Sequence, residues 1–400
     1  MEVLLICLLI LCPVLIQGKS TIEPCSISGP CSALVGYVLP TDLKVSELAT
    51  RFQVDPFSLL GANGFDPYAS GAQTQILPAK SMVKVPIKCS CVDGIRKSVS
   101  TMYQANQVDT LQSIAESVFG GLVTWDQLKD ANKIADTGII DVGQSLVIPL
   151  PCTCFNGTDD GLPAVYMSYV VRNGDSLISI GKAFGTTVTD LMGVNSLQSS
   201  LITAGDILAV PLSACSSSNL NLSSDSDLLV ANGSYALTAN RCVQCNCGPN
   251  EMNLHCVEST LGTSCPSMQC NDSNLLIGDA IEQQTSAGCN VTACLYGGYL
   301  NGTIVTNLTN FLQPQCLGKY LGPVYTKPPT SPATTTQNST IPESPSSAMS
   351  PSSHTIGVVK SNPASQPLGS SCPANEPLRW LSLLSIWITG LPYLIHVCAR

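Results

Sequence analysis

Histidine is scarce among the side chains that could do acid–base chemistry in this 400-residue sequence, which contains three. His354 and His396 lie near the C-terminal end, so His255 alone falls in sequence that we expect to fold. A nucleophile–histidine–acid triad or a histidine-rich metal site needs a histidine held beside its partners. The sequence therefore favours a protein that is not an enzyme and that binds no metal or other cofactor.

Paired carboxylates and clustered cysteines give further candidates. Hydrolysis of a glycosidic bond uses two carboxyl groups across that bond. Asp279 and Glu282, on one face of a predicted helix, and Asp159-Asp160 are possible pairs, with solvated surface acids as the favoured alternative. Cys242-x2-Cys245-x-Cys247 has the spacing of half a zinc site. In an exported chain, disulfide bonds are the favoured alternative.

The elements that would position a binding site repeat along the chain. Apolar side chains recur at intervals of 66 residues, at Val45, Leu111 and Leu177 and again at Phe52, Val118 and Phe184. A fixed period of this kind marks repeated modules. We refer to them as the first copy (36–88), the second copy (102–150) and the third copy (168–212).

Each copy is predicted to fold as a β-α-α-β unit, as the third copy illustrates. Tyr169 to Val171 has strand composition. Asp175 is placed to cap a first helix and Thr187 a second, shorter one. The run from Ile207 to Val210 is β-prone and stops at a proline. The predicted fold class is therefore α+β.

The other two copies carry comparable helix-start signals. In the second copy, Asp109 takes the first cap position, and Thr124-Trp125-Asp126-Gln127 predicts a capping box at the second helix. In the first copy, Asp55-Pro56 predicts a cap followed by a first-turn proline.

Together these residues resemble the LysM carbohydrate-binding module. Its pattern has an opening Tyr strand, an Asp-Thr/Ser-Leu helix start, a mid-repeat Asn and a closing Gly-x-x-Leu-x-Ile/Val-Pro. The second and third copies match it through Asp109-Thr110-Leu111, Asn132 and Gly143 to Pro149, and through Asp175-Ser176-Leu177, Asn195 and Gly205 to Pro211. The first copy departs from it, because Leu43 replaces the Asp and Lys80 replaces the Gly.

The resemblance implies a shallow groove for N-acetylglucosamine units between the loop after the first strand and the loop before the last. Backbone groups would bond the N-acetyl amides, and small apolar side chains would touch the acetyl methyl. The implied groove residues are Asp109, Thr110, Ile139 and Ile140 in the second copy and Asp175, Ser176, Leu201 and Ile202 in the third. Alternatively, Asp109 and Asp175 only cap helices, and Ile140 and Ile202 only fill the core.

Cys-x-Cys spacers link the copies, which are too small to bury a large core alone. Six cysteines allow 15 pairings, and the residues alone do not choose among them. The arrangement resembles triple-LysM plant chitin-receptor ectodomains. That resemblance implies the pairs Cys25–Cys91, Cys31–Cys154 and Cys89–Cys152 and one compact block.

Residues 215–316, the Cys-rich region, hold ten more cysteines and no further copy. This density predicts a disulfide-stapled domain.

Glycosylation sequons along the chain predict a heavily glycosylated exterior. They lie at Asn156, Asn221, Asn232, Asn271, Asn290, Asn301, Asn307 and Asn338.

The two ends predict export and anchoring. Residues 1–18 have the pattern of a signal peptide. Residues 323–371 hold nine prolines among Ser and Thr, as in a disordered stalk. Residues 372–400, with attachment near Ser370, have the layout of a glycosylphosphatidylinositol (GPI) signal; the alternative is a retained single-pass helix. Removing both ends takes away four of the 20 cysteines and leaves 16, an even number.

The charge balance limits the partners. The net charge is −9 and there is no basic run, so nucleic acid is excluded as an expected ligand.

The whole pattern resembles plant GPI-anchored LysM receptors of the peptidoglycan- and chitin-binding group. The resemblance implies a receptor on the outer face of the plasma membrane that binds peptidoglycan or chitin oligosaccharides and triggers innate immunity. It would signal through a membrane-spanning LysM receptor kinase, as a homo-oligomer or with related LysM proteins. The alternatives are a structural cell-wall-surface glycoprotein and a receptor for symbiotic lipo-chitooligosaccharides.

Overall fold

The computed structural model describes residues 21–316 apart from 27–28, 136–137, 156–161, 218–221 and 249–252. The predicted signal peptide, stalk and attachment signal, including Ser370, lie outside the described residues. So do the sequons at Asn156, Asn221 and Asn338 and the pair Asp159-Asp160. Within the described part, no helix is long and apolar enough to cross a bilayer.

All three copies contain two main helical segments between two long strands, and the first copy adds the short 3-10 helix η1. The first copy comprises β1 (Cys31–Val38), β2 (Leu43–Lys44), α2 (Val45–Phe52), α3 (Pro56–Ala62), η1 (Ala72–Thr74), β3 (Ile76–Leu77) and β4 (Met82–Val92). The second comprises β5 (Ile95–Gln104), α4 (Leu111–Ser113), the π-helix η2 (Ile114–Val118), α5 (Trp125–Ala131) and β6 (Ser145–Pro151). The third comprises β7 (Ala164–Val170), α6 (Leu177–Phe184), α7 (Val188–Val194) and β8 (Ile207–Ser216).

The predicted caps of the second helices are confirmed. Thr124 Oγ1 accepts the Gln127 amide at 3.2 Å, and the Gln127 side chain accepts the Thr124 amide at 3.0 Å. Asp55 accepts the amide of Ser58 at 3.0 Å, and Thr187 Oγ1 accepts that of Asp190 at 3.0 Å. These bonds fix where each helix begins, because they satisfy amides that have no partner inside the helix.

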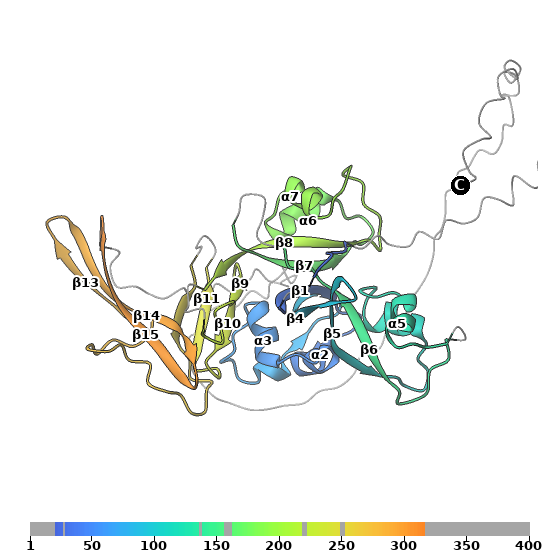
Figure 1. The fold of residues 1–400 in the computed structure, drawn as a ribbon, viewed down its shortest axis with the longest axis horizontal. Coiled ribbons are helices and arrows are strands. Elements are labelled where there is room, and N and C mark those ends of the chain that lie inside the picture. The colour runs from blue at the N-terminus through green and yellow to red at the C-terminus, as the bar shows by residue number, and fades with distance from the viewer. Residues whose placement is uncertain are drawn as a thin grey trace, which may run out of the picture. The chain divides into compact units, whose positions relative to one another are not determined.

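One seven-stranded sheet connects the copies, in the order β6-β5-β4-β1-β7-β8-β9 (Figure 1). Strands β1 and β4 are antiparallel within the first copy, as are β7 and β8 within the third. The first and third copies meet where β1 pairs in parallel with β7, from Leu34 opposite Met167 to Gly36 opposite Tyr169. In Figure 1, α6 and α7 lie on the opposite side of these strands from α2 and α3.

The first and second copies share one hydrophobic core, whereas the third has its own. Phe52 of the first copy meets Phe119 of the second edge to face, with ring centroids 5.7 Å apart. Phe119 also meets Tyr103 at 5.9 Å. Such ring pairs add to the stabilisation that burial supplies, so these two copies should unfold together.

Three disulfide bonds cross the spacers. They join Cys25 to Cys91, Cys31 to Cys154 and Cys89 to Cys152, the pairing that the family resemblance implies. The closed loops span 66, 123 and 63 residues. Cross-links over such long segments restrict the unfolded chain strongly, which compensates for the small core of each copy.

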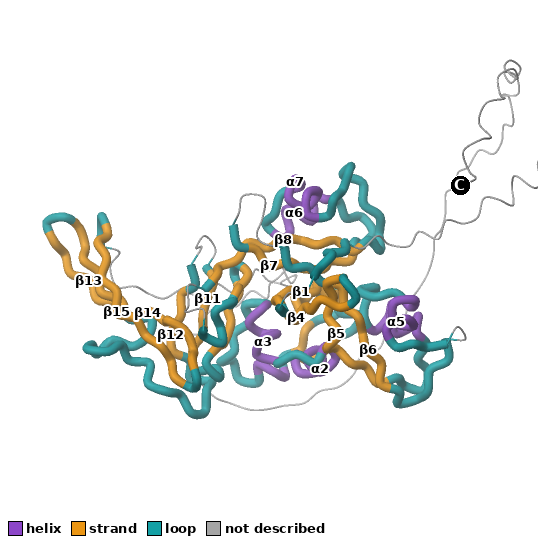
Figure 2. The backbone as a smooth tube through the Cα atoms, in the orientation of Figure 1, coloured by secondary structure: helices purple, strands orange, loops and turns teal. Residues whose placement is uncertain are grey.

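The Cys-rich region is built of strands and loops, whereas helices occur in the three copies (Figure 2). Six of its strands form two further three-stranded sheets, β10-β11-β12 and β13-β14-β15, whereas β9 is the edge strand of the seven-stranded sheet. Five disulfide bonds join Cys215 to Cys247, Cys242 to Cys265, Cys245 to Cys256, Cys270 to Cys294 and Cys289 to Cys316. The strands are β9 (Leu229–Ala231), β10 (Ser234–Thr238), β11 (Val243–Cys247), β12 (His255–Glu258), β13 (Ala280–Thr285), β14 (Gly288–Leu300) and β15 (Thr303–Gln313).

This region docks on α3 of the first copy. Tyr235 is buried in the core of the first two copies and donates its hydroxyl to the Phe65 carbonyl at 2.8 Å. Arg241 pairs with Asp55 at 2.7 Å while its guanidinium lies 4.5 Å from the centre of the Phe57 ring. The first copy is thus held between the second copy and the Cys-rich region.

Candidate glycan-binding loops

In the second and third copies, a tyrosine on the first strand is bonded to the aspartate six residues later. The hydroxyl of Tyr103 donates to Asp109 at 2.8 Å, and that of Tyr169 donates to Asp175 at 2.7 Å. Each carboxylate also accepts a backbone amide three residues before it, from Asn106 at 2.7 Å and from Arg172 at 2.8 Å. The aspartate therefore ties the turn after the strand to the strand itself.

The predicted role of these aspartates as helix caps is wrong. The N-caps are Thr110 and Ser176, whose hydroxyls accept the amides of Ser113 at 3.0 Å and of Ser179 at 3.1 Å. Asp109 and Asp175 each lie one position before the N-cap. Their carboxylates accept a hydrogen bond from the tyrosine hydroxyl on the preceding strand and do not cap the helix. Thr110 and Ser176 are exposed, but capping already engages their hydroxyls.

Burial raises the pKa of Tyr103 above its ordinary value, and the hydrogen bond to Asp109 raises it further. The pKa of Tyr169 is raised for the same two reasons. Both phenols therefore remain neutral donors at neutral pH. The carboxylates stay engaged with them instead of turning toward solvent.

A reciprocal pair of backbone hydrogen bonds joins the two loops of each copy. In the second copy, the Ala105 amide donates to the Gln144 carbonyl at 2.9 Å, and the Gly143 amide donates to the Ala105 carbonyl at 2.7 Å. In the third copy, Val171 makes the equivalent pair with Asp206 and Gly205 at 2.8 Å each. Gly143 and Gly205 have φ of 79° and 95°, which requires glycine or a strained side chain. The family pattern's closing Gly is explained by this turn.

The structure separates the four predicted apolar groove residues into two kinds. Ile139 and Leu201 are 74% and 84% exposed. Ile140 and Ile202 pack partly against the cores of their copies, in agreement with the alternative that assigned them to the interior. Of these four residues, Ile139 and Leu201 therefore offer free apolar surface, and in the second copy Val108 and Val142 of the same loops are exposed as well.

The mid-repeat asparagine clamps the second helix to the last strand. Asn195 donates to the carbonyls of Leu191 and Ala209 at 2.8 Å each and accepts the Ala209 amide at 2.7 Å. Asn132 makes the same three contacts with Leu128 and Val147. Asn63 does so with Leu59 and Lys84 in the first copy. Sequence reasoning missed Asn63, although its place one residue after the second helix was a usable signal.

The first copy differs where the groove would lie. Strands β2 and β3 pair directly, with Leu43 opposite Leu77 and Lys44 opposite Ile76. Counted from Lys80, which stands at the Gly143 position, Ile76 and Leu77 correspond to Ile139 and Ile140. The two loops of the first copy are therefore hydrogen-bonded to each other. In the second and third copies, the described residues of these loops form no strand.

The tyrosine of the first copy has also found other partners. Tyr37 lacks an aspartate at position 43, and its hydroxyl donates to the Val118 carbonyl of the second copy at 2.8 Å. The Tyr37 hydroxyl oxygen in turn accepts a hydrogen bond from the Arg51 guanidinium at 2.7 Å. Burial raises the pKa of Tyr37, although Arg51 opposes the shift. In the first copy, the Tyr37 hydroxyl therefore joins the first copy to the second and does not hold the turn that follows its own strand.

Two of the alternative sites, the Asp279–Glu282 pair and the zinc half-site, are contradicted, whereas Asp159-Asp160 lies outside the described residues. Asp279 and Glu282 do not share a helix face: Asp279 precedes β13 and accepts the Leu276 amide, and Glu282 lies within the strand. Cys242, Cys245 and Cys247 are each in a disulfide bond, so they offer no thiolate to zinc.

Comparisons with known proteins agree with this geometry. The LysM domain family matches residues 103–149 and 169–211. "LysM domain-containing GPI-anchored protein 1" of Arabidopsis thaliana is 52% identical, over 90% of this chain and 88% of its own. "LysM domain-containing GPI-anchored protein LYP6" of rice is 51% identical, over 76% of each. The rice "Chitin elicitor-binding protein" is 32% identical, over 68% of this chain and 75% of its own. These relatives are named for binding or anchoring and not for catalysis.

Proposed function

This chain belongs to the family of plant LysM domain-containing GPI-anchored proteins, and from that premise we propose that it is a cell-surface receptor for N-acetylglucosamine-containing glycans. The ligands are fragments of bacterial peptidoglycan or fungal chitin, which share this sugar. The rice relative named for chitin elicitor binding supports this ligand class.

We assign binding to the second and third copies and give the first a structural role. The observation that carries this assignment is the state of the two loops. In the first copy they pair through β2 and β3, which occupies backbone groups that a glycan amide would need. In the other copies the described loop residues form no strand, the Tyr–Asp bond holds the turn of the first loop, and Ile139 and Leu201 are exposed to solvent. Ordered loops lose little entropy on binding.

Each such site is small, so affinity should increase with glycan length. A second site on the same polymer is filled at a high effective concentration. The same polymer can bridge two receptor molecules or a receptor and a partner. A lipid-anchored protein has no cytoplasmic segment, so we propose that signalling passes through a membrane-spanning LysM receptor kinase.

The test uses three exposed apolar residues at equivalent positions. Ile139→Ser and Leu201→Ser should each weaken binding of long chito-oligomers by about 5- to 10-fold, because an aliphatic side chain loses its contact with the sugar. Ile76→Ser is the matched control, since Ile76 is 63% exposed in the first copy. It should leave the affinity unchanged. Calorimetric titration with oligomers of increasing length gives the measurement.

Two results would contradict the assignment. An Ile76→Ser effect as large as the other two would place binding outside the second and third copies. No retention of the wild-type protein on either insoluble chitin or peptidoglycan would favour the structural-glycoprotein alternative.

The kinase partner is tested separately. Long oligomers should increase co-precipitation of a LysM kinase from plant membranes. A response that persists without every such kinase would refute that part.

A further inference from the structure

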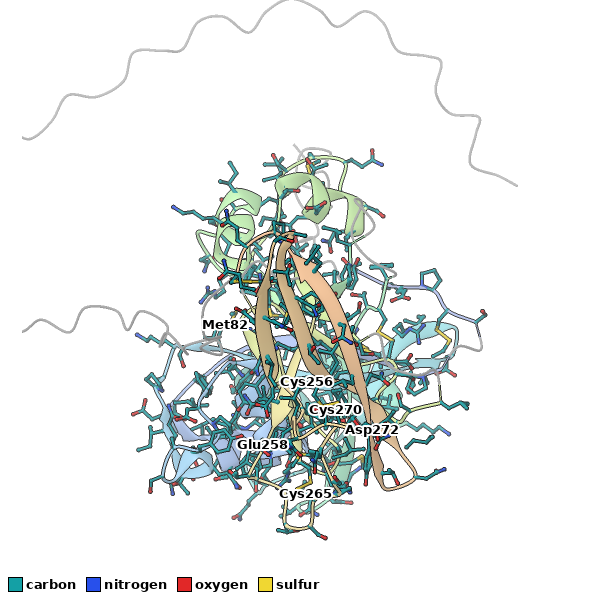
Figure 3. The ribbon with its side chains drawn as sticks, turned by 90° about the vertical axis from the view of Figure 1, so that its left-hand side faces the viewer. Met82, Cys256, Glu258, Cys265, Cys270 and Asp272 are labelled. Carbon is teal, nitrogen blue, oxygen red and sulfur yellow. A yellow bond between two sulfur atoms is a disulfide. The ribbon has the colours of Figure 1, made fainter. Side chains whose placement is uncertain are left out.

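A cavity of about 330 Å³ lies where the first copy, the third copy and the Cys-rich region meet. Its wall is drawn from four separate segments: β4, the end of α6, β8 and the turn between β9 and β10. The lining residues are Met82, Lys84, Ala183, Phe184, Gly185, Leu212, Ser213 and Asn232. Met82 is labelled in Figure 3, below the helices of the third copy.

The cavity has the chemistry of a small sugar site. Met82, Phe184 and Leu212 give it an apolar side. Lys84 and Ser213 give it a polar side, and no carboxylate lines it. At about 330 Å³ it falls at the lower end of the range for small-molecule sites, about 300–1,000 Å³. An amide-bearing sugar presents apolar ring faces, a methyl group and several oxygens, which suits this division.

Lys84 is a cation with few partners in this wall. Among the described residues, its ammonium has one hydrogen-bond partner, Ser234 Oγ at 3.2 Å. An ammonium has three donors, so two remain for a ligand or solvent. Burial also lowers the pKa of Lys84, because it removes water from around the ammonium. An oxygen-rich group in the cavity would replace part of that water.

Asn232 is the one lining residue to which a sugar can be covalently attached. Asn232-Gly233-Ser234 is a glycosylation sequon, and Asn232 is exposed. Its backbone is fixed, because the Asn232 amide donates to the Ser213 carbonyl at 2.8 Å and the Gly233 amide donates to the Cys247 carbonyl at 2.9 Å. The attachment point is therefore held at the rim of the cavity.

We propose that the first N-acetylglucosamine of a glycan on Asn232 occupies this cavity. The sugar ring packs against Phe184 and Met82, and its oxygens accept hydrogen bonds from Lys84. This sugar then joins the first copy, the third copy and the Cys-rich region. Close to the cavity, the Cys215–Cys247 disulfide bond already links β8 of the third copy to β11 of the Cys-rich region, so the sugar chiefly adds a link from these two parts to the first copy. The glycan at Asn232 is a structural element, whereas those at outward-facing sequons are not.

The test compares Asn232→Gln with Asn271→Gln and with Thr303→Val in the full glycosylated chain from plant cells. Thr303→Val removes the Asn301 sequon without replacing Asn301 itself, whose φ of 49° suits asparagine. Asn271 and Asn301 are exposed sequons that do not line the cavity. Loss of the Asn232 glycan should lower Tm by about 2–4 °C, whereas the two control variants should keep the wild-type Tm. Glycopeptide mass spectrometry establishes which sequons are occupied.

Enzymatic trimming gives a second measurement that needs no substitution. An endoglycosidase that leaves one N-acetylglucosamine on each site should not change Tm. Under native conditions, a peptide N-glycosidase should release the glycan of Asn301 readily and that of Asn232 only after unfolding. In a Lys84→Met background, the Tm loss caused by Asn232→Gln should shrink, because the two groups interact.

Three outcomes would each overturn the proposal. They are an unoccupied Asn232, native release at Asn232 as fast as at Asn301, and an Asn232→Gln protein as stable as the two controls. Failure of glycan-ligand binding in the loops of the second and third copies would leave this inference unaffected, since the cavity and those loops share no residue.

Discussion

Replacing Asn195 with alanine should destabilise the third copy. Asn195 is 4% exposed and is hydrogen-bonded to Leu191 of α7, twice to Ala209 of β8, and to the Thr21 hydroxyl, which donates to its side-chain oxygen. Each neutral hydrogen bond contributes about 0.5–1.5 kcal/mol net, and a buried group left without a partner costs about 1–3 kcal/mol. Leu191 and Ala209 are buried, so water does not replace the lost amide easily. We expect a cost of about 2–4 kcal/mol.

Hydrogen exchange is the suitable assay, because a multi-part protein with eight described disulfide bonds need not unfold in one step. Amides of β7 and β8 should exchange about 30- to 700-fold faster in Asn195→Ala, since each 1.4 kcal/mol corresponds to tenfold. Amides in the shared core of the first two copies should change much less. Gln198→Ala, at a nearby exposed position, is the control. Unchanged exchange in β7 and β8 would refute the clamp as a source of stability.

Three further predictions concern the loop turns, the Tyr–Asp pair and the Cys-rich region. Gly205→Ala should lower the free energy of unfolding by about 1–2 kcal/mol in thermal unfolding, because a φ of 95° strains a side chain. Lys80→Gly, at a φ of 64° in the first copy, should be neutral or stabilising. A stabilising Gly205→Ala together with a destabilising Lys80→Gly would contradict this explanation. Asp175→Ala should lower Tm and weaken chito-oligomer binding together, since it frees the turn that Tyr169 and Arg172 hold; weaker binding at an unchanged Tm would instead indicate direct ligand contact. Tyr296 donates to the buried carboxylate of Asp225 at 2.6 Å, and burial together with that bond raises its pKa well above the usual 10.0. The folded state therefore keeps a proton that the unfolded chain loses above pH 10, so this contribution to stability is present below pH 10 and is lost as the pH rises beyond it. Tyr296→Phe should be less stable at neutral pH and show a flatter alkaline decline in pH-dependent unfolding, and an equally steep decline would rule out Tyr296 as its source.

Local signals in the sequence were sufficient for the starts of the second helices. Thr124, Thr187 and Asp55 each cap a helix through an amide three residues ahead, and such a bond depends on little beyond the neighbouring residues. The 66-residue period similarly determined the repeated order of elements, because apolar spacing selects which face of each helix is buried.

The same local reasoning failed for Asp109 and Asp175. Either of two adjacent residues can cap a helix, and the choice was made by a tyrosine hydroxyl on the preceding strand. That hydroxyl reaches the carboxylate only once the strand and the turn have packed together. The residue types were visible in the sequence, but their partners were not.

Contacts between distant segments were decided by the tertiary structure alone. The bond from Tyr37 to Val118 spans 81 residues, and the bond from Tyr235 to Phe65 spans 170. The spacer disulfides follow the pairing implied by a family resemblance, since spacing alone allows 15 arrangements. The residues alone were enough to predict which modules form and where their second helices begin, because those bonds lie within a few residues. Which loops pair could not be predicted in this way, because it depends on whether two loops some 30 residues apart bond to each other, as Leu43 and Leu77 do.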